Sequence, residues 1–272
     1  MERVALVTGA GSGIGLATAL EAARLGFTTV ATVHRAAQQD GVAAAAADAG
    51  VEVTTDVLDV TDDDRVRDVI DRHRPWGLVN AAGELLASLV IDVPIDEARA
   101  HLDLMILGPA RTIRSAVPHM RRRDGGRIVN VSSVASSAIG PLLGWYGVAK
   151  AGLSALSEAL RPEVSGYGIE VVLVEPGPFA TPIWAKARER LEARRDESLE
   201  PDSYARAMAV GDEVGKRARD PDHVARVIGA TLRAGHPRFR YRVGAGSAAA
   251  TAMTRFVPTS VKDRVTRAAG GL

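Results

Sequence analysis

Cysteine is absent from this sequence of 272 residues, which excludes disulfides, thiolate zinc sites and cysteine nucleophiles. The six histidines show no H-x-x-x-H or comparable ligand spacing, so we expect no metal site. The formal net charge of +1 favours neither nucleic acid nor an anionic membrane as a partner. No apolar run approaches about 18 residues, and the first residues lack a signal-peptide pattern. We therefore expect a cytoplasmic protein without an integral membrane span.

Lysine is also scarce, with four lysines against thirty arginines. One of the four, Lys150, follows Tyr146 by four residues in a segment that we expect to be helical from 144 to 166, so both side chains share one helix face. A nearby ammonium stabilises a phenolate, and we expect it to lower the tyrosine pKa from roughly 10 by about 2 units. Tyr146 is then a candidate general acid or base. Y-x-x-x-K by itself also fits a solvated surface pair.

Ser133 favours the catalytic interpretation of this pair. It comes two residues after an apolar run, 128–131, that is typical of a short buried strand. A strand end there can direct the Ser133 hydroxyl at the same substrate oxygen as Tyr146. The candidate catalytic residues are therefore Ser133, Tyr146 and Lys150.

A glycine-rich turn near the start of the chain predicts a nucleotide site. An apolar strand, 4–7, leads into Gly9-Ala10-Gly11-Ser12-Gly13-Ile14-Gly15, and an amphipathic helix follows. Glycines permit a tight turn and a close backbone approach, and the amides at the helix N-terminus bind a pyrophosphate. A glycine-rich turn alone is weak support, but its place between the first strand and a helix makes it strong.

The end of the second expected strand, 28–33, bears on cofactor choice. An acidic residue at this position usually binds a free ribose 2′-hydroxyl, but no Asp or Glu occurs before Asp40. His34 and Arg35 offer positive charge to a 2′-phosphate instead. The sequence thus favours NADP(H) over NAD(H); the alternative is that Arg35 points into solvent.

Strands and helices alternate along the chain without hairpins. Further strands are expected at 51–55, 76–79 and 169–174, and further helices at 36–49, from 61–62 onward and at 94–120. This alternation predicts an α/β fold with a parallel sheet covered on both faces.

The chain resembles the short-chain dehydrogenase/reductase family over nearly its whole length. The matching pieces occur in the family's order: T-G-A-G-S-G-I-G at 8–15, D-V at 59–60, N-A-A-G at 80–83, Ser133, Y-x-x-x-K at 146–150 and P-G at 176–177. The resemblance implies a single domain over 1–272, with a Rossmann-type, doubly wound sheet of about seven parallel strands, the last at 238–243. It implies that Asp59 and Val60 border the adenine, that Asn80 supports the cofactor strand, and that Lys150 also holds the nicotinamide ribose. The predicted cofactor-binding residues are Gly9, Ser12, Gly13, Ile14, Gly15, His34, Arg35, Asp59, Val60, Asn80, Ala81, Gly83, Lys150, Pro176, Gly177 and Thr181.

Met105 departs from the family pattern. The family usually has an asparagine in the long helix, where it helps to hold a water in a proton relay that ends at the lysine. Met105 occupies that place and cannot donate a hydrogen bond. The relay then uses a backbone carbonyl instead, or turnover is slower; a third alternative is that Met105 packs in the core between helices.

Substrate identity depends on the least family-like part of the chain, 179–219, which we expect to form a lid over the cleft. The D-P-D-H-V-A-R-V-I and P-R-F-R-Y-R-V-G stretches, at 220–228 and 237–244, are similar to the branch containing 17β-hydroxysteroid and retinol dehydrogenases. Two interpretations fit Leu142, Leu143 and Trp145 equally well: they line an apolar pocket, or they only pack in the core. The tail, 245–272, is open to three interpretations: it covers the pocket, touches a membrane surface, or forms a solvated amphipathic helix, the default.

The leading hypothesis is an NADP(H)-dependent oxidoreductase that interconverts a secondary or allylic alcohol and its carbonyl compound, with a bulky apolar substrate resembling a steroid or retinoid. The competing hypothesis is a nucleotide-sensing binding protein on the same fold with reduced catalysis. The family resemblance also implies a homodimer or homotetramer formed by the helices at 94–120 and 144–166.

Overall fold

The computed structural model describes residues 3–244 and 257–270. Within them, one seven-stranded parallel sheet has the strand order β3-β2-β1-β4-β5-β6-β7. The strands are β1 (Val4–Thr8), β2 (Thr28–Val33), β3 (Thr54–Val57), β4 (Gly77–Asn80), β5 (Gly126–Val131), β6 (Ile169–Pro176) and β7 (Arg240–Val243). The expected parallel sheet is therefore confirmed. The order reverses between β1 and β4, where open α/β sheets bind their ligands.

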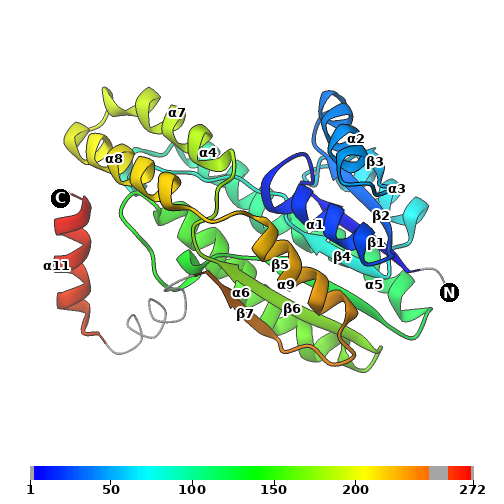
Figure 1. The fold of residues 1–272 in the computed structure, drawn as a ribbon. Helices are drawn as coiled ribbons and strands as arrows, with labels where there is room; N and C mark the ends of the chain where they lie inside the picture. Colours follow the sequence, from blue (N-terminus) through cyan, green and yellow to red (C-terminus); the bar gives the residue numbers. More distant parts are fainter. Residues whose placement is uncertain (1–2, 245–256, 271–272) are drawn as a thin grey trace.

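Helices cover both faces of the sheet (Figure 1). Ala5 and Val7 of β1 pack toward one face and Leu6 toward the other, as the two-residue period of a strand requires. The first face carries α1 (Gly13–Arg24), α2 (Gln39–Asp48) and α9 (Asp222–Arg233). The second carries α3 (Asp63–His73), α5 (Gly108–Arg121) and α6 (Gly144–Ser165).

Two elements differ from their predicted bounds. The third strand begins at Thr54 instead of 51, because the amide of Val51 donates to the carbonyl of Ala46 and closes α2. The helix expected at 94–120 is divided into α4 (Ile95–Leu102), a π-helical segment (Asp103–Leu107) and α5. Pro109 explains the division, since proline has no amide to donate to the preceding turn and its ring crowds that turn.

The last helices lie beside the sheet. Helices α7 (Ile183–Arg195) and α8 (Pro201–Arg217) pack against each other, and α11 (Thr259–Gly270) lies next to α8 (Figure 1). The expected tail helix thus exists over 259–270, whereas its expected beginning, at 245–256, and the two final residues lie outside the described residues. None of the helices in the described part of the chain is long and apolar enough to cross a membrane.

Candidate active site

The glycine-rich turn lies between β1 and α1, against the turn that follows β4. Gly9 and Gly13 have φ angles of +67° and +56°, which favour glycine. A Cβ at Gly9 would lie 2.5 Å from the Cα of Ala82, so a side chain there would separate the two turns. The Thr8 hydroxyl accepts hydrogen bonds from the amides of Ala81 and Ala82, both at 3.1 Å. Thr8 was part of the sequence motif, but its role as a tie between the turns was not predicted.

Helix α1 starts at this turn with amides available to an anion. The first amides of any α-helix have no acceptor within the helix, and the Ser12 side chain makes no capping hydrogen bond to them. Thr181 lies opposite: a Cβ at Gly13 would lie 3.0 Å from the Thr181 side chain. Ile14 packs against the core from the first turn of the helix and orients it. The structure therefore brings Thr181, far away in sequence, to the glycine-rich turn.

Polar and charged side chains gather at the end of β2. His34 Nδ1 lies 3.6 Å from Asp59 Oδ2, and both side chains are exposed to solvent. Burial raises the pKa of Asp59, but hydrogen bonds from the backbone and side chain of Thr61, together with His34 and Arg111, hold that pKa below its ordinary value. Arg35 is exposed and forms no ion pair within the described residues. Gln38 was missed by sequence reasoning: its side-chain amide would lie 2.6 Å from a Cβ at Gly11, beside the glycine-rich turn.

The turn after β4 is fixed by a buried hydrogen-bond chain. Asn80 donates to Asn130 Oδ1 at 2.9 Å, Asn130 donates to Ser157 at 2.9 Å, and Thr112 donates to Asn80 Oδ1 at 2.7 Å. This chain joins β4, β5, α5 and α6. Asn80 thus holds neighbouring elements together at the end of β4, and its support of the cofactor strand stays a prediction.

Three further predicted cofactor-binding residues are Val60, Pro176 and Gly177. Val60 is buried against Gly108, with 2.6 Å between its Cγ2 atom and a Cβ built there. The amide of Gly177 donates to the carbonyl of Val243 at 2.8 Å, so the turn after β6 is attached to the last strand.

Ser133, Tyr146 and Lys150 converge at the carboxyl end of β5. Tyr146 and Lys150 share one face of α6, and the Lys150 Nζ atom lies 5.8 Å from the centroid of the Tyr146 ring. The Ser133 side chain is hydrogen-bonded to Tyr146. Lys150 Nζ donates to the carbonyl of Val131 at 2.8 Å, which fixes the lysine beside the strand end. The three side chains can therefore act on one small molecule.

The expected lowering of the Tyr146 pKa is wrong for this structure. Burial raises the pKa of Tyr146, and the hydrogen bond from Ser133 lowers it by less. Burial also lowers the pKa of Lys150 to about 8. The ammonium is bound to a carbonyl and lies beside the ring, and desolvation disfavours the charged form of each group.

Met105 lies in the π-helical segment and is 1% exposed. A Cβ at Gly83 would lie 2.9 Å from Met105 Sδ and 4.0 Å from Lys150 Nζ, so Met105 fills the space behind Gly83. The amide of Glu84 also donates to Met105 Sδ at 3.4 Å. Of the alternatives left open by the sequence, this placement favours the packing role.

An apolar cluster adjoins Tyr146 on the side of α7 and α8. Its buried members come from the segment after β4, from the loop before α6 and from the two helices: Leu85, Ala87, Leu89, Leu142, Ala187, Leu191, Tyr204 and Met208. Leu143, Tyr146 and Trp184 pack against it, whereas Trp145 belongs to a separate cluster with Leu86. The segment 179–219 therefore lies next to the candidate catalytic side chains and supplies apolar surface there.

The comparisons with known proteins agree with this arrangement. The family described as "short chain dehydrogenase" matches residues 3–192. An uncharacterised oxidoreductase of Bacillus subtilis (strain 168) is 31% identical over 253 residues, which cover 90% of each chain. A short-chain dehydrogenase of Streptomyces avermitilis superimposes with a TM-score of 0.78 at 30% identity, over 98% of this chain and 96% of that one. A variant actinorhodin polyketide ketoreductase solved with NADPH gives a TM-score of 0.75 at 25% identity, over 90% and 97%.

These matches span most of the sequence, and they accompany a sheet order and a glycine-rich turn that bind nucleotides in α/β proteins. The chain belongs to the short-chain dehydrogenase/reductase family.

Proposed function

We propose that the protein is an NADP(H)-dependent oxidoreductase that interconverts a bulky, apolar secondary or allylic alcohol and its carbonyl compound. One observation carries the proposal: Ser133, Tyr146 and Lys150 converge beside an apolar cluster formed with α7 and α8. The actinorhodin polyketide ketoreductase solved with NADPH supports the choice of cofactor. The steroid- or retinoid-like nature of the substrate rests on the apolar cluster and on the sequence likeness of 220–228 and 237–244.

The described residues fit a nicotinamide dinucleotide phosphate. The uncapped amides of α1 would bind the pyrophosphate, and Thr181 lies beside them, 3.0 Å from a Cβ built at Gly13. Arg35 places positive charge at the end of β2, where a 2′-phosphate would lie, and His34 adjoins it in the chain. Asn80, Ala81 and Gly83 would border the nicotinamide half, together with Lys150, Pro176 and Gly177. When bound, NADPH supplies the hydride that adds to the carbonyl carbon and is oxidised to NADP+.

The protein's own residues manage the proton. Tyr146 Oη donates its proton to the carbonyl oxygen in reduction and accepts it back in oxidation. Ser133 Oγ donates a hydrogen bond to the same oxygen, and the Lys150 ammonium stabilises the phenolate that remains. Because burial raises the pKa of Tyr146, the phenol is protonated at neutral pH, as an acid for carbonyl reduction must be. The segment 179–219 acts as a lid that excludes water from this exchange.

The test is a panel of ketones, secondary alcohols and allylic alcohols, each assayed with NADP(H) and NAD(H) by the absorbance of the reduced nicotinamide. We expect turnover of bulky apolar members with NADP(H), and weaker turnover of small polar ones. Turnover confined to small polar compounds would contradict the substrate class, and a preference for NAD(H) the cofactor. Tight nucleotide binding without turnover of any member would favour the nucleotide-sensing alternative.

A further inference from the structure

A fully buried carboxylate lies at the end of β6, one residue before Pro176. The Glu175 side chain has no exposed surface, and two arginines of β7 pair with it. Arg240 contacts Oε1, and Arg242 Nε lies 3.2 Å from Oε2. Removing a carboxylate from water is costly unless such partners compensate its charge. Three charged side chains are thus concentrated where the sheet meets the candidate active site.

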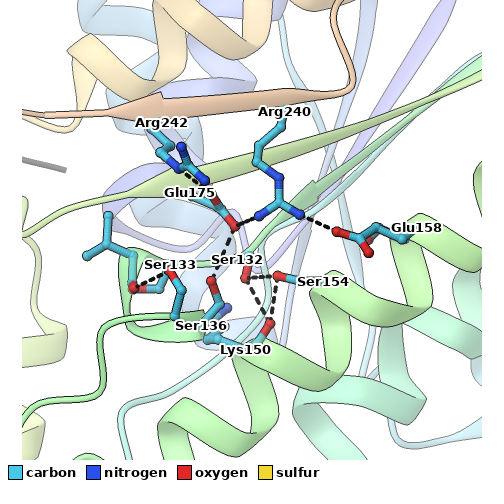
Figure 2. A network of polar contacts seen from close by, with 12 residues as sticks. Ser132, Ser133, Ser136, Lys150, Ser154, Glu158, Glu175, Arg240 and Arg242 are labelled. Atoms are coloured by element: carbon cyan, nitrogen blue, oxygen red, sulfur yellow. Dashed lines mark hydrogen bonds and ion pairs between the residues drawn. The ribbon is translucent and has the colours of Figure 1, made fainter. Parts of the chain in front are cut away.

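The same carboxylate also holds the segment that carries Ser133. The Ser136 hydroxyl donates to Glu175 Oε1 at 3.2 Å (Figure 2). Ser136 is the last residue of the short 3-10 turn η4 (Val134–Ser136), and Ser133 is its N-cap, accepting a hydrogen bond from the amide of Ala135 at 3.1 Å. Ser133 is therefore at one end of a rigid turn whose other end is bound to Glu175.

Arg240 extends this link to the helix that carries the other two candidate catalytic side chains. Its second guanidinium nitrogen pairs with Glu158, three turns after Tyr146 on α6. A second, more direct link connects the residue before Ser133 to α6, since Ser132 Oγ donates to the carbonyl of Lys150 at 3.0 Å. Figure 2 shows the two ties side by side. Together they fix where Ser133 lies relative to α6.

We propose that Glu175 is a positioning residue that, through Ser136 on one side and Arg240 on the other, holds Ser133 in hydrogen-bonding reach of Tyr146. The role rests on the proposed function, because it presupposes that Ser133 and Tyr146 act on one substrate oxygen. Glu175 itself touches neither residue in the hydrogen bonds of the described chain. The competing account is that the buried ion pair only joins β6 to β7.

Ser136→Ala separates the two accounts because it cuts the link to η4 and leaves Glu175 with both arginines. We expect kcat to fall roughly 10-fold, less than the ~100-fold that a misplacement of about 1 Å can cost, while NADPH affinity and melting temperature stay near the wild type. Since the hydrogen bond from Ser133 lowers the pKa of Tyr146, its weakening should move the alkaline limb of the pH–rate profile to higher pH. Ser136→Thr retains the hydroxyl and should restore both quantities. Ser165→Ala, an exposed serine at the end of α6, is the matched control.

An Ser136→Ala variant with the wild-type kcat and pH–rate profile would overturn the proposal. A crystal structure of that variant with NADP+ provides a second test that needs no turnover: we expect Ser133 Oγ to have left hydrogen-bonding reach of Tyr146, and an unmoved Ser133 would refute the role. A wild-type protein that turns over nothing in the panel contradicts the proposed function instead, and the crystal structure then still decides the position of Ser133.

Discussion

At the residue scale, burial is the largest influence on the pKa values of Tyr146 and Lys150. Burial raises the pKa of the Tyr146 phenol and lowers that of the Lys150 ammonium to about 8. Near neutral pH the phenol is therefore protonated and neutral, and the lysine is positively charged. Each is in the form that carbonyl reduction requires. The spacing of these residues could be predicted from the sequence, but their proton affinities could not, because those depend on Val131, Ser133 and the apolar cluster around them.

Arg35 is the residue on which cofactor preference can be tested. It is exposed at the end of β2 and has no acidic partner within the described chain, so its charge is available to a 2′-phosphate. Arg35→Ala should weaken NADPH binding more than NADH binding, by roughly 1 kcal/mol or more for a charge-assisted contact, read by nucleotide titration. Arg24→Ala, an exposed arginine at the end of α1, serves as the control. Equal loss of affinity for both nucleotides would show that Arg35 does not bind the 2′-phosphate.

Met105 tests whether the departure from the family pattern concerns packing or proton transfer. Met105→Asn buries an amide among apolar neighbours, so we expect it to cost about 1–3 kcal/mol of unfolding free energy and to leave the pH–rate profile unchanged. Met105→Leu conserves volume and should cost less than about 1.5 kcal/mol. Thermal melts and pH–rate curves on both variants provide the comparison. A faster Met105→Asn enzyme with a shifted pH profile would restore the relay hypothesis.

At the scale of elements, α7 is attached to the segment that follows β4. Arg190 donates to Glu84 Oε2 at 2.5 Å and to the carbonyl of Leu85 at 3.0 Å, and Arg194 pairs with Glu97. His101, followed by Arg190, lowers the pKa of Glu84 to about 2. The carboxylate therefore stays charged at any pH used in an assay, and this attachment of the proposed lid does not depend on pH there.

Glu84→Gln should loosen α7 without disturbing the glycine-rich turn. The contact with Arg190 is partly exposed to solvent and contributes about 1 kcal/mol, which corresponds to a roughly fivefold higher KM for a bulky substrate. Trypsin should also cut faster within the arginine-rich helix. Asp96→Asn, a neighbouring exposed carboxylate paired with Arg99, is the control. If KM and cleavage rate both match the wild type, the attachment does not hold the lid.

Sequence patterns predicted these elements unequally. The strands with continuous apolar runs, such as β5 and β6, were placed within two residues, because burial on both faces leaves a clear signal. The predicted start of β3 was wrong, since the amide of Val51 is hydrogen-bonded to Ala46 at the end of α2. The π-helical segment had only Pro109 as its signal. The ties made by Gln38, Glu84 and Glu175 join segments distant in sequence, so no local pattern could have predicted them.

At the scale of the whole molecule, we expect the protein to assemble into a homodimer or homotetramer. The helices at 94–120 and 144–166 were expected to pair across a two-fold axis, and both expose apolar side chains: Leu107 is 51% and Val148 is 49% exposed. We expect light scattering to show a dimer or tetramer at micromolar concentration. Val148→Glu should shift it toward monomer, because a buried unpaired charge opposes association. Val210→Glu, at an exposed valine of α8, should not; a wild-type protein that is only monomeric would refute the expectation.

The central claim is that Tyr146 transfers the proton in a nicotinamide-dependent reaction, and Tyr146→Phe tests it most directly. The variant keeps the ring that packs beside Lys150 and loses only the hydroxyl, so NADPH binding and melting temperature should stay close to the wild type. Tyr167→Phe, a more exposed tyrosine just after α6, is the control. We predict that kcat with a bulky ketone falls at least ~100-fold in Tyr146→Phe, the scale of lost general acid catalysis. Turnover comparable to the wild type would contradict the account.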